Sequence, residues 1–358
     1  MTPPPNPPLG IIEGYFGRSW SWDDRAAVVD QLAPAGYSFF HYAPKIDAKL
    51  RRDWSALHTS EEMDALSAFS DHCRARGMRF GVGLTPYGAH LDFSAGVKAS
   101  LAQKLDALDA IGLDDLAILF DDMQGDLPDL AERQAEIIAF TLDHSKAARF
   151  FTCPSYYSDD PLLDRVFGAR PDNYLETLGR LIDPAIQIYW TGEEVCSAEY
   201  SVGHLRSVAE RLGRKVCLWD NYPVNDGPRM SNHLHLRSFT GRPADIGEWV
   251  SGHAINPASQ PLLSCIPALT LVESYAQGSD YCYGAAFRAA AEAIVGPELA
   301  KMLQADLLTF QNGGLDQLQE RRARLTERYG AIDHPAAREV CDWLCGGYAI
   351  TGEMLQTQ

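Results

Sequence analysis

Positive charge is scarce in this sequence. Its 358 residues contain 31 Lys and Arg against 48 Asp and Glu, which gives a formal net charge of −17 at pH 7. Proteins that bind nucleic acid need a basic stripe that neutralises the phosphates, and this sequence has none. We therefore expect no nucleic-acid partner, and we interpret the acidity as favouring solubility.

Long apolar runs are also lacking. Nowhere do eighteen apolar residues follow one another, as a membrane-spanning helix would need. The N-terminus has no basic segment followed by an apolar one, which is the pattern of a secretion signal. We expect no membrane partner and a cytoplasmic location. The Pro-rich stretch Thr2–Leu9 predicts a flexible leader over residues 1–9.

The eight cysteines lack the spacing of a zinc site, because no CxxC pair occurs among them. Cys153, Cys217 and Cys265 lie in or near apolar segments, where cysteine acts as a small hydrophobic residue. Cys341 and Cys345 lie four residues apart on an expected helix and would face one side, but they lack two further ligands. We interpret the cysteines as structural thiols.

The histidines offer no better metal site. His233 and His235 form a pair, but no two-His motif closes the first expected strand, as a barrel metallohydrolase would usually need. We therefore expect neither a metal ion nor a cofactor.

Apolar segments that end in Gly, Pro, Trp, Tyr or a polar residue recur along the chain. They begin roughly 30–40 residues apart, the length that a strand and a crossover helix need. The eight expected strands are Gly10–Gly14, Tyr37–Lys45, Arg79–Thr85, Asp115–Asp121, Arg149–Pro154, Ala185–Trp190, Lys215–Trp219 and Gly252–Asn256. Helix-period segments lie between them at Asp24–Ala35, Glu61–Arg76, Ser100–Ile111, Leu130–Ser145, Leu175–Leu181 and His204–Leu212. Eight such units predict a TIM (β/α)8 barrel rather than an open doubly wound sheet, which needs a topological switch point and commonly fewer strands.

The length and the 46% hydrophobic content suffice for one large core and a small appendage. We assign the barrel to residues 10–280. Beyond it, helical patterns at Ala285–Leu308 and Leu315–Tyr329 predict helices that complete the barrel, followed by a small C-terminal helical extension within residues 281–358.

Two adjacent acids, Asp121 and Asp122, stand where the apolar run Leu116–Phe120 stops. Neighbouring side chains on a strand point to opposite faces, so both acids can reach one substrate only if the backbone turns at the end of the strand. Crowding and burial would raise the pKa of one carboxyl group and leave an acid beside a base, a division of labour that glycosidases use. The alternative, of equal weight from the doublet alone, is that one acid caps the next segment while the other is solvated.

The remaining strand ends carry similar kinds of residue. Active sites of TIM barrels lie at the C-terminal ends of the strands. The ends here are Glu13-Gly14-Tyr15, Lys45, Tyr87, Asp121-Asp122, Tyr157, Trp190, Asn221 with Asp226, and Asn256. Acids and amides bond to hydroxyl groups, and aromatic faces pack against sugar rings, so this set predicts a sugar site.

Together these segments resemble one family, the glycoside hydrolase family 84 β-N-acetylglucosaminidases, which include the protein O-GlcNAcases. Seven matching segments occur in the family's order over about residues 10–275. They are Gly10–Arg18 with Trp20, Tyr42–Lys45, Phe120–Asp122, Cys153–Tyr157, Trp190–Gly192, Trp219–Asp226 and Asn256-Pro257. Each segment alone is a weak signal, whereas seven in order are a strong one.

The resemblance implies a retaining exo-acting mechanism in which the 2-acetamido oxygen of the substrate attacks the anomeric carbon and forms an oxazoline. Asp121 matches the family's acid that accepts the acetamido N–H and polarises that group. Asp122 matches the acid that protonates the leaving oxygen and then deprotonates water. A carboxylate beside the N–H makes the amide oxygen more nucleophilic as positive charge develops on the ring.

The same resemblance implies substrate-binding roles for seven further residues. Gly14 corresponds to a backbone contact, Lys45 to a hydroxyl-binding lysine and Trp219 to a wall of the pocket.

Four polar residues complete the implied substrate contacts. Tyr157 would bind near the acetamido group or the anomeric centre, and Asn221 would contact the acetamido region. Asp226 and Asn256 would hold the 4- and 6-hydroxyl groups. The implied substrate is a GlcNAc-containing glycoprotein or small glycoconjugate.

Two departures from the family's pattern concern the pocket rim. The first motif has Tyr15-Phe16 where many relatives have the aromatics in another order, and Ile46 follows Lys45 where others often have an acid. These positions bear on substrate preference more than on chemistry. The aglycone, the tolerance for GalNAc and the oligomeric state stay open, with a dimer among the alternatives.

Two other functions remain open from the sequence. The first is a catalytically silent GlcNAc-binding barrel, which normally lacks the general acid that Asp122 would supply. The second is a classical two-carboxylate glycosidase of other specificity, which needs a carboxylate from a different strand; Glu193, Glu194 and Asp220 are the candidates.

Overall fold

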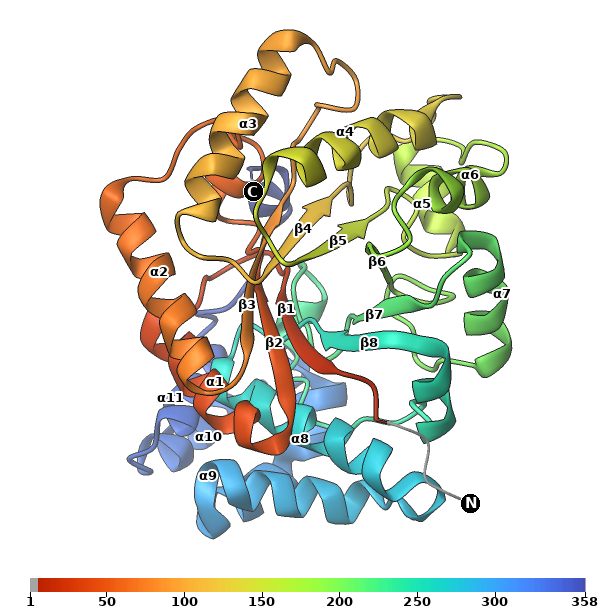
Figure 1. The fold of residues 1–358 in the computed structure, drawn as a ribbon. Coiled ribbons are helices and arrows are strands. Elements are labelled where there is room, and N and C mark those ends of the chain that lie inside the picture. The colour runs from red at the N-terminus through yellow and green to blue at the C-terminus, as the bar shows by residue number, and fades with distance from the viewer. Residues whose placement is uncertain (1–5, 358) are drawn as a thin grey trace.

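The computed structural model describes residues 6–357 and contains a closed barrel of eight parallel strands in sequence order (Figure 1). The strands are β1 Leu9–Glu13, β2 Tyr37–Tyr42, β3 Arg79–Leu84, β4 Asp115–Leu119, β5 Arg149–Cys153, β6 Gln187–Trp190, β7 Val216–Asp220 and β8 Val250–Ile255. Most strand residues are buried, because the barrel interior covers one face and the surrounding helices the other. The predicted TIM (β/α)8 barrel is confirmed.

Helices surround the barrel. They are α1 Trp22–Leu32, α2 Ser60–Ala75, α3 Ala95–Asp109, α4 Leu130–His144, α5 Pro161–Phe167, α6 Tyr174–Leu181 and α7 Val202–Leu212. A side-chain hydrogen bond caps the start of α1, α2, α5 and α7. Reciprocal capping boxes start α1 at Ser21 and α2 at Thr59. Helix α5 was not predicted from the sequence and is only seven residues long. In the described chain, β7 and β8 are joined through the short 3₁₀ turns Met230–Asn232 and Ala244–Trp249 in place of an α-helix.

Large aromatic and polar side chains fill the barrel interior. The ring of His41 lies 4.7 Å from that of Phe151, which stacks on Tyr189 at 5.4 Å. His41 Nε2 bonds Asp115 Oδ2 at 3.0 Å, and Tyr189 Oη bonds His41 Nδ1 at 2.6 Å. Gly81 leaves room for this layer, since a Cβ there would lie 2.7 Å from the His41 ring. The barrel is therefore a packed core and not a pore.

The C-terminal helices cover one side of the barrel. Helix α8, Pro261–Gln277, packs against α1 and against α9, Tyr283–Leu308, and Figure 1 shows α8 and α9 running side by side. Helix α9 is interrupted at Gly296, whose φ is 76°. Helices α10 Arg321–Gly330, α11 Pro335–Leu344 and α12 Gly352–Thr357 follow. The buried Glu339 of α11 accepts hydrogen bonds from two backbone N–H groups at the start of α8, so it ties this extension to the barrel.

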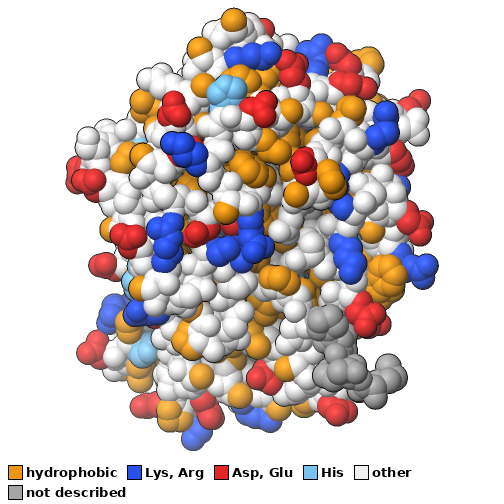
Figure 2. Space-filling model, in the orientation of Figure 1, with side chains coloured by type: hydrophobic (Ala, Val, Ile, Leu, Met, Phe, Trp, Pro, Cys, Tyr) orange, Lys and Arg blue, Asp and Glu red, His pale blue; other side chains and the backbone are white. Residues whose placement is uncertain are grey.

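The chain enters the barrel one residue earlier than predicted, at Leu9, and the Pro8 carbonyl accepts a hydrogen bond from His253 N at 2.9 Å. Residues 1–5 of the predicted leader lie outside the described residues. Between residues 6 and 357, each helix is too short or too polar to cross a lipid bilayer. Figure 2 shows acidic and basic side chains interspersed around the rim of one face, with a group of basic side chains near its middle.

Candidate active site

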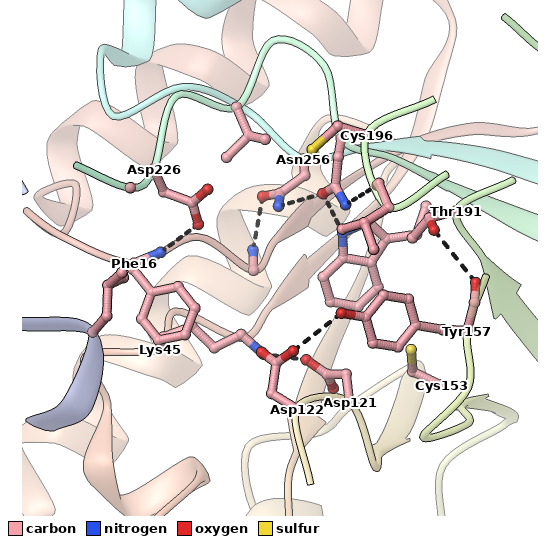
Figure 3. Close-up of a pocket in the computed structure, with 17 residues that line it drawn as sticks. Phe16, Lys45, Asp121, Asp122, Cys153, Tyr157, Thr191, Cys196, Asp226 and Asn256 are labelled. Carbon is pink, nitrogen blue, oxygen red and sulfur yellow. Dashed lines mark hydrogen bonds and ion pairs between the residues drawn. The ribbon is translucent and has the colours of Figure 1, made fainter. Parts of the chain in front are cut away.

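A pocket of about 240 Å³ opens at the C-terminal ends of the strands. It is lined by Gly14, Phe16, Lys45, Asp121, Asp122, Cys153, Tyr157, Thr191, Val195, Cys196, Trp219, Asn221, Val224, Asp226, Gly227, Asn256 and Leu355 (Figure 3). Ligand pockets commonly measure roughly 300–1,000 Å³, so this one suits a single sugar ring better than a long oligosaccharide. All nine residues for which the sequence predicted catalytic or binding roles line it.

A left-handed turn brings the two adjacent acids to the same pocket. Strand β4 ends at Leu119, and Asp122 has a φ of 58°, a conformation that costs a non-glycine residue about 1–3 kcal/mol. This turn overcomes the strand alternation that would otherwise point Asp121 and Asp122 in opposite directions. Figure 3 shows both carboxylates facing the pocket. The predicted turn at the end of the strand is therefore present.

Asp121 is held as a carboxylate by neighbouring cations. It is 6% exposed, and its Oδ2 forms an ion pair with Nζ of Lys45, which is 4% exposed. Burial alone would raise the pKa of Asp121, but the charges of Lys45 and Arg51 and the hydrogen bond from Lys45 outweigh it and lower that pKa. The adjacent pair in the sequence predicted an acid beside a base without saying which of the two residues is which, and the lowered pKa of Asp121 is the direction required of the ionised member. Its buried Oδ1 has no hydrogen-bond partner among the described residues.

Asp122 has a different environment. Its Oδ1 accepts a hydrogen bond from Tyr157 Oη at 3.1 Å. Burial and the charges of both acids raise the pKa of Tyr157 well above its ordinary value, so the phenol remains a hydrogen-bond donor. The pair therefore consists of one acid bound to a cation and one bound to a neutral donor.

The side chains of Asn221 and Asn256 are linked by hydrogen bonds along another wall of the pocket. Asn221 Oδ1 accepts from Trp219 Nε1 at 3.1 Å and from Asn256 Nδ2 at 3.0 Å, and Asn256 Oδ1 accepts from Gly14 N at 3.2 Å. A Cβ at Gly14 would lie 2.3 Å from the Trp219 ring. The missing side chain of Gly14 thus makes room for the tryptophan wall, and its backbone contact with the sugar stays a prediction.

Asp226 closes another side of the pocket. Its Oδ2 accepts a hydrogen bond from Phe16 N at 2.9 Å. Burial raises the pKa of Asp226 to about 6, although the Phe16 N–H and the charge of Lys45 act in the lowering direction. The pocket therefore contains a third carboxyl group, and its pKa is raised to about 6.

Four strand-end residues named in the sequence analysis do not line the pocket: Glu13, Tyr15, Tyr87 and Trp190. Tyr15 is 1% exposed, and its Oη donates a hydrogen bond to Glu13 Oε1 at 3.3 Å. Glu13 is fully buried and forms an ion pair with Arg25 at 2.7 Å. Trp190 is fully buried, with its Nε1 directed to His204 at 3.0 Å, and Tyr87 is half exposed. These positions are structural or peripheral, which the strand-end pattern alone does not reveal.

The three candidates named for the second carboxylate of a two-carboxylate mechanism also lie elsewhere. Asp220 is fully buried and binds Arg242 at 2.7 Å and His253 at 3.0 Å. Glu193 and Glu194 are exposed. None of the three is among the residues that line the pocket.

Eight lining residues had no predicted site role: Phe16, Cys153, Thr191, Val195, Cys196, Val224, Gly227 and Leu355. Cys153 is buried, as expected, and also faces the pocket. Most of the eight lie in or beside the matching segments, so proximity to those segments was the available signal. Leu355 on α12 is remote in sequence and offered none. Within residues 6–357, no group of three or more His, Cys, Asp or Glu side chains is arranged to hold a metal ion.

Comparison with known proteins agrees with this geometry. Residues 9–310 match the family model described as β-N-acetylglucosaminidase. The protein O-GlcNAcases of Mus musculus and Rattus norvegicus are each 28% identical over 258 residues, which is 69% of this chain and 28% of each relative. A structure of a mutant Thermobaculum terrenum O-GlcNAc hydrolase superposes with a TM-score of 0.78 at 26% identity, covering 94% of this chain and 80% of that one. The chain belongs to the β-N-acetylglucosaminidase family of glycoside hydrolases.

Proposed function

We propose that this protein is a retaining exo-β-N-acetylglucosaminidase that uses the acetamido group of its substrate as the nucleophile. The observation that carries the proposal is the left-handed turn at Asp122, which presents two carboxylates to one pocket. The cation-bound acid of that pair, Asp121, has a buried oxygen with no partner among the described residues.

In the proposed reaction, Asp121 Oδ1 accepts the acetamido N–H of the bound sugar. The acetamido oxygen then attacks the anomeric carbon, and the bond from that carbon to the glycosidic oxygen breaks as Asp122 protonates the departing oxygen. The product is a protonated oxazoline, whose N–H stays hydrogen-bonded to the Asp121 carboxylate. Asp122, now a carboxylate, removes a proton from water, and the resulting hydroxide opens the oxazoline with net retention. Lys45 keeps Asp121 ionised, so the group that polarises the amide does not compete for the proton.

The other lining residues would bind the sugar. We assign Asp226 and Asn256 to the 4- and 6-hydroxyl groups and Trp219 to the flat face of the pocket. Asn221 would contact the acetamido region. Lys45 binds Asp121 in the free protein, so contact with a sugar hydroxyl would be its second role.

The substrate class is also a proposal, because the match covers only 28% of the length of the mammalian relatives. We propose terminal β-linked GlcNAc on a glycoprotein Ser or Thr or on a small conjugate. The names of the mouse, rat and Thermobaculum relatives favour O-GlcNAc. The cytoplasmic location, the lack of a nucleic-acid partner and the oligomeric state remain predictions of the sequence.

The direct test compares an aryl β-N-acetylglucosaminide with its N-trifluoroacetyl analogue. Fluorination weakens the acetamido oxygen as a nucleophile and leaves the aglycone unchanged, so we expect a steep fall in kcat/KM. Similar rates for both compounds would indicate a protein nucleophile. Failure to hydrolyse either compound would favour the silent binding barrel, and equal activity toward 2-hydroxy and 2-acetamido sugars would also contradict the proposal.

The pH dependence of kcat/KM should reflect the ionisation of Asp226. If its carboxylate binds the sugar hydroxyls, kcat/KM should fall as the pH drops through about 6, the pKa of this group in the free protein. Asp226→Asn should lower kcat/KM at pH 8 and remove this limb of the profile. A limb that persists unchanged in the variant would contradict the assignment.

The Asp226→Asn variant should be more stable than the parent protein at pH 8, although its kcat/KM is lower. The folded-state pKa of Asp226 lies above its ordinary value of 3.8, so ionising this group above pH 6 costs folding free energy. We therefore expect Asp226→Asn to have a higher Tm than the parent protein at pH 8. This difference should shrink as the pH falls from about 6 to about 4, between the folded and the ordinary pKa of the group, and thermal melts at pH 8 and pH 4 will measure it.

A further inference from the structure

Three buried polar side chains lie behind the Asp121–Asp122 turn and take no part in the proposed chemistry. They are Gln134 on α4, Ser155 in the loop after β5, and Tyr174 at the start of α6. Gln134 and Ser155 are fully buried, and Tyr174 is 2% exposed. Burying polar groups costs free energy unless they are hydrogen-bonded, so their partners indicate what they do.

The three side chains form one closed hydrogen-bond circuit. Ser155 N donates to Tyr174 Oη at 3.2 Å, and Tyr174 Oη donates to Gln134 Oε1. Gln134 Nε2 donates to Ser155 Oγ at 2.8 Å, and Ser155 Oγ donates to the Phe120 carbonyl at 2.9 Å. Because the serine oxygen already accepts from the amide, its own proton is directed to Phe120. The circuit thus orients one hydroxyl group at one backbone carbonyl.

That carbonyl immediately precedes the acid pair. Phe120 joins the end of β4 to Asp121, and the backbone then enters the left-handed conformation at Asp122. Beyond the pair, the Gln124 carbonyl bonds His90 Nε2 at 3.0 Å. A strained conformation persists only where its surroundings determine it, and here hydrogen bonds hold the backbone on both sides of the pair.

We propose that Ser155, oriented by Gln134 and Tyr174, is a positioning residue that sets the angle at which Asp121 and Asp122 enter the pocket. The inference rests on the proposed function, because it concerns the same reaction. Without this hydrogen bond the backbone ahead of the turn can rotate, and both carboxylates shift together relative to the sugar. The charges of the two acids stay as they are, and only their placement changes.

The test is Ser155→Ala, assayed with two β-N-acetylglucosaminides that differ only in the leaving group. A displacement of about 1 Å at an active site can cost about 100-fold in rate, so we expect kcat to fall about 10- to 100-fold with KM within about twofold. The fall should be deeper for the alkyl glycoside than for the nitrophenyl glycoside, because the alkyl leaving group depends on proton donation. Gln134→Met should also lower kcat more for the alkyl than for the nitrophenyl glycoside, but by smaller factors. It provides a second variant if Ser155→Ala folds poorly.

Thr152 on β5 provides a matched control. Thr152 Oγ1 donates to the Ile118 carbonyl at 2.9 Å, a bond of the same kind and burial that lies below the turn. Thr152→Val removes that bond in a side chain of nearly the same shape. We expect it to lower Tm, and to leave the ratio of rates for the two leaving groups as in the parent protein.

Binding of a thiazoline analogue of the oxazoline, measured by calorimetry, counts active sites and separates the two proposals. Rates per active site in Ser155→Ala that equal the parent's, or that fall in equal proportion for both leaving groups, would overturn the positioning role. A parent protein that binds the analogue but hydrolyses neither glycoside would contradict the proposed function instead.

Discussion

Asp122→Asn is expected to separate substrates by the quality of their leaving groups. General acid catalysis contributes roughly 10²- to 10⁴-fold, and kcat/KM for an alkyl β-N-acetylglucosaminide should fall by about that factor. A dinitrophenyl glycoside needs no proton to depart, so its kcat/KM should stay within about tenfold of the parent value. Its kcat should still fall, because the same residue serves as the base that activates water.

Azide provides the control for this assignment. As an anion it opens the oxazoline without losing a proton, so it should restore kcat of Asp122→Asn on the dinitrophenyl glycoside and yield the β-glycosyl azide. The parent protein should not respond to azide. If both leaving groups lose the same factor and azide has no effect, Asp122 is not the acid and base.

Asp121→Asn should impair the reaction whatever the leaving group. The carboxylate stabilises positive charge that develops along the acetamido group, and losing one such preorganised contact commonly costs about 10²- to 10³-fold in kcat. We expect losses of this order for both the dinitrophenyl and the alkyl glycoside. Azide should give no rescue, because formation of the oxazoline becomes the slow step.

Two controls distinguish this loss from misfolding or from another nucleophile. Breaking a buried ion pair typically costs about 3–5 kcal/mol, but asparagine retains an acceptor for Lys45, so we expect a smaller fall in stability and a folded variant. Glu193→Gln and Glu194→Gln remove two exposed carboxylates that the sequence offered as candidates for the second carboxylate of a two-carboxylate mechanism. Both should retain parental activity, whereas a covalent glycosyl-enzyme trapped on either residue would contradict the assignment of Asp121.

The strand pattern was readable from the sequence because each barrel strand is buried on both faces. Such burial requires a continuous apolar run, and the turn after each run requires different residues. All eight predicted strands therefore have a counterpart in the barrel. The helix α5 escaped prediction because seven residues hold too little of the helical period to be recognised. The break in α9 at Gly296 depends on a single backbone conformation, which a periodic pattern does not record.

The residues of the candidate site were also readable, since parallel strands bring their C-terminal ends to one face. That geometry gathers Gly14, Lys45, Asp121 and Asn256 from four separate strand ends into one pocket. The same reasoning selected Glu13, whose carboxylate is bound by Arg25 of α1. A position at the end of a strand brings a residue to the C-terminal face of the barrel. Whether its charge is free to act there depends on the neighbouring helix, as Arg25 of α1 shows for Glu13.

The sequence by itself determined the barrel, the order of its strands and the identity of the two adjacent acids, because these follow from local periodicity and from short motifs. Only the tertiary structure decided the ionisation of Asp121. The pKa of Asp121 is lowered because Lys45, 76 residues away in sequence, pairs with it inside the protein. The turn at Asp122 and the circuit of Ser155, Gln134 and Tyr174 likewise depend on contacts between separate strands and helices. Coulomb interactions and hydrogen bonds act over a few ångströms of space, and distance along the chain does not encode them.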